Sequence, residues 1–109
     1  MEDLLTQMEQ CTSVQACIEL AIMDAYGEDE QAAGWQACLE TIFEGIEQAC
    51  VLGKEVSLEG FDIAGGCSVV AICRKGNKTA KVTPDSLEFP KATKAQSLWF
   101  KAWRERSRA

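Results

Sequence analysis

The side chains best suited to chemistry are carboxylates around a break between two predicted helices. Asp24 lies before Gly27, and Glu28, Asp29 and Glu30 follow it directly. Ca²⁺ takes six to eight oxygen ligands at roughly 2.3–2.6 Å, mainly from carboxylates and carbonyls. The four acids are therefore candidate ligands for a divalent cation. Such a site would be assembled from side chains and a backbone carbonyl, because the sequence contains no EF-hand loop.

Helix geometry limits how many of these acids can share one ion. Successive helix residues point about 100° apart, so Glu28, Asp29 and Glu30 cannot all face the same point. One or two of them, together with Asp24, form the predicted ligand set. The plainer alternative is that acids in a first helical turn compensate the helix dipole and its free N–H groups.

A second acidic set lies in the other half of the chain. Glu55 and Glu59 fall on one face of a predicted strand, and Asp62 lies in the loop predicted after it. These residues are the second candidate for a cation site. The plainer alternative here is a solvated outer face of the sheet.

Catalytic chemistry is not predicted. The sequence has no histidine, which removes the commonest general base and the Ser–His and Cys–His pairs. Its cysteines form no CxxC pair, which disfavours a zinc site. In a reducing compartment we expect them to be small buried apolar side chains rather than disulfides. The six cysteines are Cys11, Cys17, Cys38, Cys50, Cys67 and Cys73.

Charge is divided unequally along the chain. Residues 1–53 hold 11 of the 17 acidic residues and none of the 11 basic ones, within a net charge of −6. An acidic half of this kind suggests a cation or a basic partner; alternatively, the two halves attract each other within one domain. Nucleic acid is disfavoured as a partner because an acidic protein repels phosphate.

The 109 residues predict one domain with one core. No apolar run approaches the roughly 20 residues that span a bilayer, so a membrane protein is not expected. The segment Met1–Leu5 carries acids where a signal peptide has basic residues. We therefore expect a cytoplasmic protein.

Helical spacing of apolar residues predicts a first helix over about residues 3–26. A break near 11–13 is an open alternative, because Thr12 and Gln15 form a weak capping-box pattern. Gly27 is predicted to end this helix in the left-handed conformation that glycine adopts readily.

A second helix is predicted from Glu28 to near Glu44, with Gly45 as its stop signal. Its stripe of apolar residues faces the core. Gly34 in its middle costs about 1 kcal/mol relative to alanine. We therefore expect another backbone to approach the helix closely there.

The middle of the chain predicts a small antiparallel sheet. Residues 68–73 are apolar on both faces, which predicts a central strand covered on each side. Gly76-Asn77 predicts a tight hairpin turn. Residues 60–66 are predicted as a loop, and 84–89 as a helical turn followed by one or two strand residues. These features indicate a small SH3-like barrel or a strongly curved sheet, with an open meander as the alternative. The other predicted strands are 46–52, 55–59 and 79–83.

A last helix is predicted from about Lys94 to Ser107, capped by Thr93. Phe100 lies beside its apolar face and is expected to be exposed. Together with Trp103 it would form a patch for a protein partner or a homodimer. The helix end carries basic residues, which suit a helix C-terminus: Arg104, Arg106 and Arg108.

One block of the sequence resembles the small bacterial calcium-binding proteins of the CcbP type. That family typically reads Asp-Ala-Tyr, then two acids, then a small residue with Gly-Trp, and a leucine four residues on. Asp24, Asp29 and Glu30 fall on its acidic positions. The resemblance implies an α+β domain with a small antiparallel sheet and an acidic protein that binds Ca²⁺. The matching segments are Asp24-Ala25-Tyr26-Gly27, Asp29-Glu30-Gln31-Ala32, Gly34-Trp35 and Leu39.

These observations predict one α+β domain with three parts. An acidic helical part covers 1–45, an antiparallel sheet covers 46–90, and a C-terminal helix covers 93–107. The function predicted by resemblance is that of an acidic, non-enzymatic Ca²⁺-binding protein. The alternative is a small protein–protein interaction or accessory module without a metal function.

Overall fold

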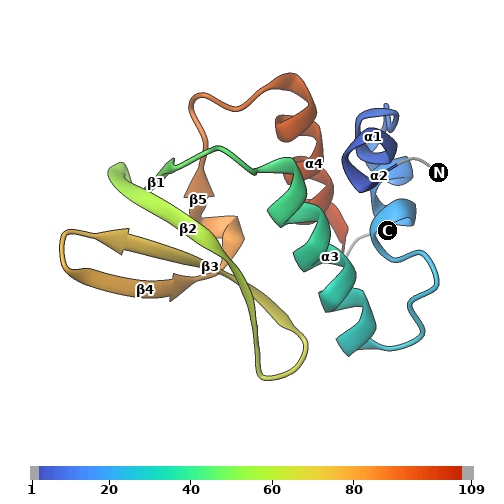
Figure 1. Ribbon diagram of the computed structural model, residues 1–109, viewed down its shortest axis with the longest axis horizontal. Coiled ribbons are helices and arrows are strands. Elements are labelled where there is room, and N and C mark those ends of the chain that lie inside the picture. Colours follow the sequence, from blue (N-terminus) through green and yellow to red (C-terminus); the bar gives the residue numbers. More distant parts are fainter. Residues whose placement is uncertain (1–2, 107–109) are drawn as a thin grey trace.

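The structure is a computed structural model that describes residues 3–106. Helices precede the strands, and a last helix follows them (Figure 1). Ser107 and Arg108, which were predicted at the end of the last helix, lie outside the described residues. The elements are α1 (Leu4–Glu9), α2 (Val14–Ala21), α3 (Glu28–Ile42), β1 (Gln48–Val51), β2 (Lys54–Ala64), β3 (Ser68–Lys75), β4 (Lys78–Val82), η1 (Pro84–Ser86), β5 (Leu87–Glu88) and α4 (Lys94–Glu105).

The elements form three layers, which confirms the predicted α+β class. Helices α3 and α4 lie between the sheet and the α1–α2 pair (Figure 1). Helix α3 packs against β2 and β3, and α4 packs against α2 and α3. No helix within residues 3–106 is long and apolar enough to cross a membrane.

The predicted first helix is two short helices. Its break lies where the capping pattern suggested one, but Ser13 rather than Thr12 caps α2, by accepting a hydrogen bond from the N–H of Ala16. Helix α2 ends at Ala21, not near residue 26. Asp24 then takes a φ of +61°, so the left-handed residue is Asp24 and not Gly27. Gly27 is extended instead and is the N-cap of α3.

The close backbone approach predicted at Gly34 is confirmed. A Cβ atom added to Gly34 would overlap the carbonyl oxygen of Ala21. The end of α2 therefore crosses α3 at a distance that no larger residue permits.

Two amide side chains form hydrogen bonds between neighbouring elements. Gln36 Nε2 donates to the carbonyl of Phe61 on β2 at 3.0 Å, and Gln96 Nε2 on α4 donates to the carbonyl of Ile42 at 2.9 Å.

The sheet has five antiparallel strands in the order β4-β3-β2-β1-β5. It is open rather than closed, so the SH3-like barrel is not formed and the curved-sheet form of the prediction holds. Two-residue turns join β1 to β2 and β3 to β4. The second is the predicted Gly76-Asn77 turn, in which Gly76 has a φ of +61°. Residues 84–88 form the predicted helical turn and short strand.

The loop predicted over 60–66 is largely strand. Strand β2 continues to Ala64, and the register with β3 shifts between Leu58 and Gly60, which marks a β-bulge. In a regular strand Leu58 and Phe61, three residues apart, would face opposite sides of the sheet. The extra residue in the bulge places both toward the helices, where both are buried. Gly60 predicts a loop by residue type, whereas in the structure it lies at the bulge.

Strand β3 is covered on one side only, which corrects the prediction of cover on both. Val69 and Ala71 are buried on the face toward the helices, and Val70 and Ile72 on the other face are half-buried. On that face the register partners of Val70 and Ile72 include Asp62 and Lys81, which form an ion pair with each other.

Helix α4 carries the centre of the core. Thr93 and Gln96 form a capping box at its start, as the sequence predicts for Thr93. Trp99 is fully buried, and its indole N–H donates to the carbonyl of Met8 at 3.0 Å. Trp103 is 3% exposed, and Phe100 is half-buried against Phe43 and Phe89. Phe100 and Trp103 therefore do not form the exposed patch expected of them.

Candidate metal centre

The predicted metal ligands lie along the turn from α2 to α3. Asp24 is in the left-handed region, which aspartate tolerates better than most residues. Asp24 lies inside a turn that is closed by the N–H of Ala25, which donates to the carbonyl of Ile22 at 3.0 Å. Asp24 is exposed, so this strained position presents a carboxylate to solvent.

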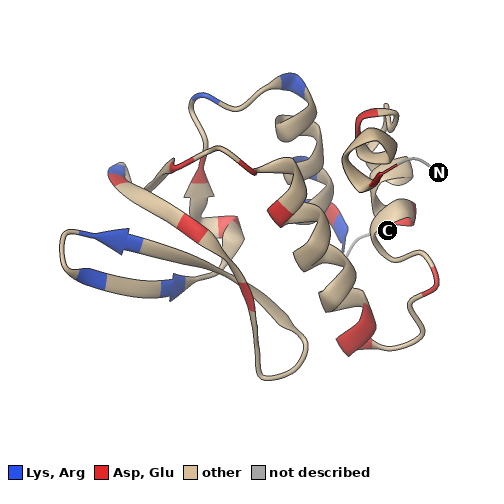
Figure 2. Ribbon diagram, viewed as in Figure 1, with Lys and Arg blue, Asp and Glu red and all other residues tan. Residues whose placement is uncertain are grey.

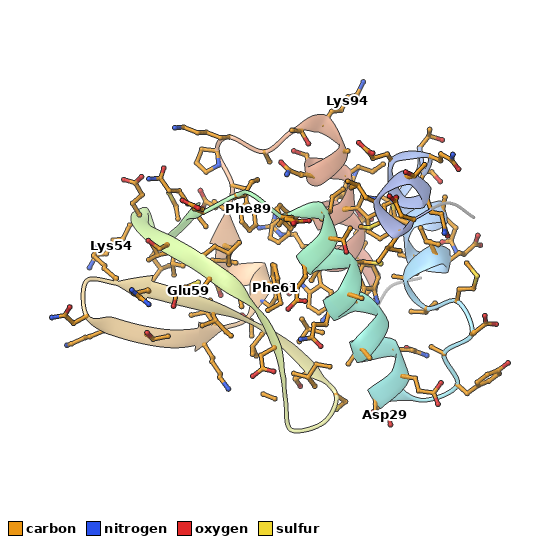
Figure 3. All side chains as sticks on the ribbon, viewed as in Figure 1. Asp29, Lys54, Glu59, Phe61, Phe89 and Lys94 are labelled. Atoms are coloured by element: carbon orange, nitrogen blue, oxygen red, sulfur yellow. The ribbon has the colours of Figure 1, made fainter. Side chains whose placement is uncertain are left out.

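The other three acids occupy the first turn of α3. Gly27 has no side chain to cap the helix, and Glu28, Asp29 and Glu30 supply negative charge to its unpaired N–H groups. Glu30 Oε2 also accepts a hydrogen bond from the N–H of Tyr26 at 3.2 Å. Asp29 Oδ1 would lie 3.0 Å from a Cβ atom at Gly27, so this carboxylate bends back over the glycine. Figure 3 shows Asp29 at the lower end of α3, where the helix begins.

The four acidic residues of the turn are exposed, and no ion pair joins any of them to a lysine or arginine within residues 3–106. They do not converge, however. Among the described residues, no group of three or more acidic, cysteine or histidine side chains is arranged to hold one ion. The turn thus offers open carboxylates and carbonyl oxygens rather than a closed cage.

Two of the three acids in the second set are paired with basic residues, whereas Glu55 is exposed and forms no ion pair within residues 3–106. Glu59 pairs with Arg74 at 3.0 Å, and Asp62 pairs with Lys81 at 3.2 Å, on the outer face of the sheet. The N–H of Ile63 and then Lys81 lower the pKa of Asp62 below its usual range. A cation there would have to displace two positive side chains. The solvated, ion-paired alternative therefore accounts for this set.

A cleft of about 370 Å³ adjoins the acidic turn and is shared by α2, α3, η1 and α4. Glu28 lines one side, and Trp35 and Trp103, whose rings meet edge to face at 5.5 Å, line its wall. Asp85 Oδ1 accepts a hydrogen bond from Trp103 Nε1 at 2.7 Å. Arg106 also lines the cleft and covers the Trp103 ring at 3.3 Å from its centroid.

Sequence reasoning missed Asp85 and Arg106 as neighbours of the acidic turn. They lie on η1 and at the end of α4, far from residue 28 in sequence, and no local spacing connects them. Burial lowers the pKa of Arg106, and the nearby Asp85 carboxylate offsets only part of this decrease. The guanidinium nevertheless stays a cation at neutral pH. Its charge opposes a divalent ion inside the cleft. A bound cation is thus favoured on the outer side of the turn.

The six cysteines are free thiols, but only three of them are buried, which corrects the expectation of small buried side chains at all six positions. Cys17, Cys38 and Cys73 are buried, Cys11 and Cys50 are half-buried, and Cys67 alone of the six is exposed. Burial, with the neighbouring thiols, raises the pKa of Cys17 to about 12 and that of Cys38 to about 11. These thiols are therefore protonated at neutral pH, and a protonated thiol neither attacks nor binds a metal.

Two solved structures share this fold. One is described as "Calcium binding protein in the calcium-binding form". It matches with a TM-score of 0.71 and 16% sequence identity over 93% of this chain and 94% of that chain. The other is "The crystal structure of Anabaena CcbP", at a TM-score of 0.65 and 15% identity over 95% of this chain and 90% of that chain.

No protein-family model matches the sequence, and no curated protein does. At 15–16% identity the two structures establish the fold alone. The resemblance to CcbP-type proteins, predicted from the segment 24–39, is thus confirmed at the level of fold.

Proposed function

We propose that this protein binds Ca²⁺ at the turn between α2 and α3, with Asp24, Glu28, Asp29 and Glu30 as the source of its carboxylate ligands. The observation that carries the proposal is the lack of any basic partner for these four acids within residues 3–106. Glu59 and Asp62 on the sheet, by contrast, are each paired with a basic residue. The two structures that share the fold are described as calcium-binding or as CcbP, which supports the same ion.

The ligand set we propose is partial. Asp24 and one or two of the acids in the first turn of α3 would bind the ion, because neighbouring helix residues point about 100° apart. Backbone carbonyls of residues 22–27 and water would complete the six to eight oxygens that Ca²⁺ takes. A site with so few protein ligands has modest affinity. It also favours Ca²⁺ over Mg²⁺, which loses its water reluctantly and demands regular octahedral geometry.

We propose a binding role rather than catalysis. The sequence has no histidine, and burial keeps the thiols of Cys17 and Cys38 protonated. Covalent catalysis needs a nucleophile beside a general base. The two protonated thiols have no histidine to act as that base. The chemistry we assign is the reversible exchange of water for carboxylate around a cation.

The thermal stability of two charge-matched variants tests the site. The double variant Asp24→Asn with Asp29→Asn removes two carboxylates from the turn. The control Glu40→Gln with Glu44→Gln removes the same charge near the opposite end of α3, where both residues are exposed. A ligand that binds the folded state at a hundred times its Kd stabilises it by about 2.7 kcal/mol.

We expect millimolar Ca²⁺ to raise the melting temperature of the wild-type chain and of the control, but much less that of the Asp24–Asp29 variant. Equal rises of the melting temperature in all three proteins would show that Ca²⁺ binds elsewhere. The absence of a shift in the wild-type chain would end the proposal.

A further inference from the structure

A groove of about 290 Å³ lies at the end of the sheet, on the face that the helices cover elsewhere. Its apolar wall is formed by Val51, Val56, Ala80 and Val82. The strand register shows that this wall continues the core face of the sheet, since Val82 pairs with Ala71, which is fully buried. The core face of the sheet thus extends beyond the helices and becomes open. Figure 1 shows the two hairpin ends projecting away from α3 and α4.

Lysines surround this groove. Lys54, Lys75 and Lys78 line it, all three are exposed, and none forms an ion pair within residues 3–106. Figure 2 shows the basic residues of the hairpin ends opposite the acidic helices, and Figure 3 shows Lys54 projecting from the end of β2. Lysines on an edge strand deter aggregation, and β4 is an edge strand. That explanation covers Lys78 but not Lys54 and Lys75, which lie on inner strands.

Leu52 adds a second, independent observation. It also lines the groove, is 92% exposed and has a φ of +52°, in the left-handed region. Two-residue hairpin turns normally place asparagine, aspartate or glycine at such positions, because a larger side chain is strained there. A leucine in this place exposes a large apolar side chain to water and strains the backbone. Both costs are expected where the side chain contacts a partner.

We propose that the hairpin-end groove is a docking site for an acidic segment of another protein. Charge complementarity selects this occupant: its carboxylates would pair with Lys54, Lys75 and Lys78. One of its apolar side chains would enter the groove beside Leu52. The volume is at the low end for small-molecule pockets, which hold roughly 300–1,000 Å³. It therefore suits one or two side chains of a peptide. This surface is distinct from the acidic turn, so the proposal does not depend on Ca²⁺ binding.

The test is an NMR titration of the ¹⁵N-labelled chain with a synthetic eight-residue peptide of alternating glutamate and leucine, in EDTA and low salt. We expect saturable shifts at amides of the groove. The variant Lys75→Ser with Lys78→Ser is expected to weaken binding at least tenfold, and Leu52→Asn at least threefold. The control Lys91→Ser with Lys94→Ser, which removes the same charge outside the groove, keeps the wild-type affinity. Spectra of each free variant verify its fold.

Several results would overturn the proposal. They are no shift at millimolar peptide, shifts confined to other surfaces, or equal binding of a glutamate–serine peptide, which would show charge attraction alone. Shifts of the same amides on dilution would identify a second copy of the chain as the occupant. Shifts caused by phosphatidylglycerol vesicles but not by the peptide would identify a lipid surface instead.

Discussion

At the scale of single residues, three positions have an unusual backbone contact or conformation: Gly34, Asp24 and Leu52. Gly34 permits the contact between α2 and α3, and that contact positions the turn that carries the acids. Asp24 and Leu52 are the described residues other than glycine with positive φ. One lies at the proposed cation site and the other beside the hairpin-end groove. Strained residues concentrate at functional sites, which is the pattern seen here.

The substitution Gly34→Ala is expected to destabilise the fold by about 1–3 kcal/mol, the usual cost of overpacking a well-packed site. Helix propensity alone predicts a gain of about 1 kcal/mol from the same change. The added methyl group would overlap the Ala21 carbonyl, which is backbone and cannot rotate away. Urea unfolding measures the difference, with Ala33→Gly on the exposed face of α3 as the control for propensity. A stabilised Gly34→Ala chain would show that α2 and α3 do not meet there.

Leu52→Asn is expected to leave stability unchanged or to raise it by up to about 1 kcal/mol, because the left-handed conformation costs most L-residues roughly 1–2 kcal/mol and asparagine less. Leu52 is 92% exposed, so its removal loses little packing. Chemical denaturation measures this effect, with Val51→Asn as the neighbouring control that loses half-buried contacts. A loss above 1 kcal/mol for Leu52→Asn would mean that the leucine serves the fold rather than a partner.

At the scale of elements, amide side chains and core aromatics tie the helices to one another. The carbonyl of Ile42 lies at the end of α3, where helix carbonyls lack helical partners. Gln96 on α4 donates to it and also accepts from the N–H of Thr93. One side chain therefore connects the end of α3 to the start of α4.

Gln96→Ala is expected to cost about 1–3 kcal/mol, the usual penalty for a buried polar group left without its partner. The neighbouring substitution Ser97→Ala, at an exposed position, is expected to change stability by less than about 0.5 kcal/mol. Urea denaturation of both variants compares them directly. Equal losses of stability in the two variants would show that Gln96 does not connect α3 to α4.

The contacts of α1, α2 and α3 also predict an alkaline loss of stability. Burial raises the pKa of Cys17 to about 12 and that of Cys38 to about 11, above the ordinary thiol value of 9.0. The unfolded chain therefore loses these protons first, and stability that is complete below about pH 9 declines as pH rises toward 11–12. Unfolding free energies at pH 8, 9 and 10 measure the decline. Cys17→Ala is expected to flatten it, and an unchanged slope would contradict the assignment.

The elements were predictable where local signals are strong. The Thr93 cap, the Gly76 hairpin and the close approach at Gly34 follow from residue type alone. The bulge at Gly60 was not predictable, because glycine signals loops and bulges alike. Residue type predicts the left-handed conformation at Gly27, but Asp24 adopts it, because α2 already ends at Ala21. Which acids lack basic partners depends on strand pairing, and so only the fold could separate the two acidic sets.

At the scale of the whole molecule, charge is distributed unequally over the elements. Helices α1, α2 and α3 carry acidic residues and no basic ones, whereas basic residues gather on the strands of the hairpin ends and along α4 (Figure 2). The division along the sequence, with no basic residue in 1–53, is thus kept in the fold. The two halves do meet within one structure, yet no ion pair joins them within residues 3–106. Within residues 3–106 both salt bridges lie inside the sheet, Glu59–Arg74 and Asp62–Lys81. The negative charge of the acidic half is therefore not neutralised by ion pairs within the described residues.

Calorimetric titration of the wild-type chain with Ca²⁺, with Mg²⁺ under the same conditions as the control, tests the central claim most directly. The account predicts a saturable heat with Ca²⁺ at micromolar to millimolar concentrations, a much weaker response to Mg²⁺, and a loss of the Ca²⁺ heat in Asp24→Asn with Asp29→Asn. Heats of dilution alone for both ions would contradict it. So would an undiminished Ca²⁺ heat in that double variant, which would place the ion away from the acidic turn.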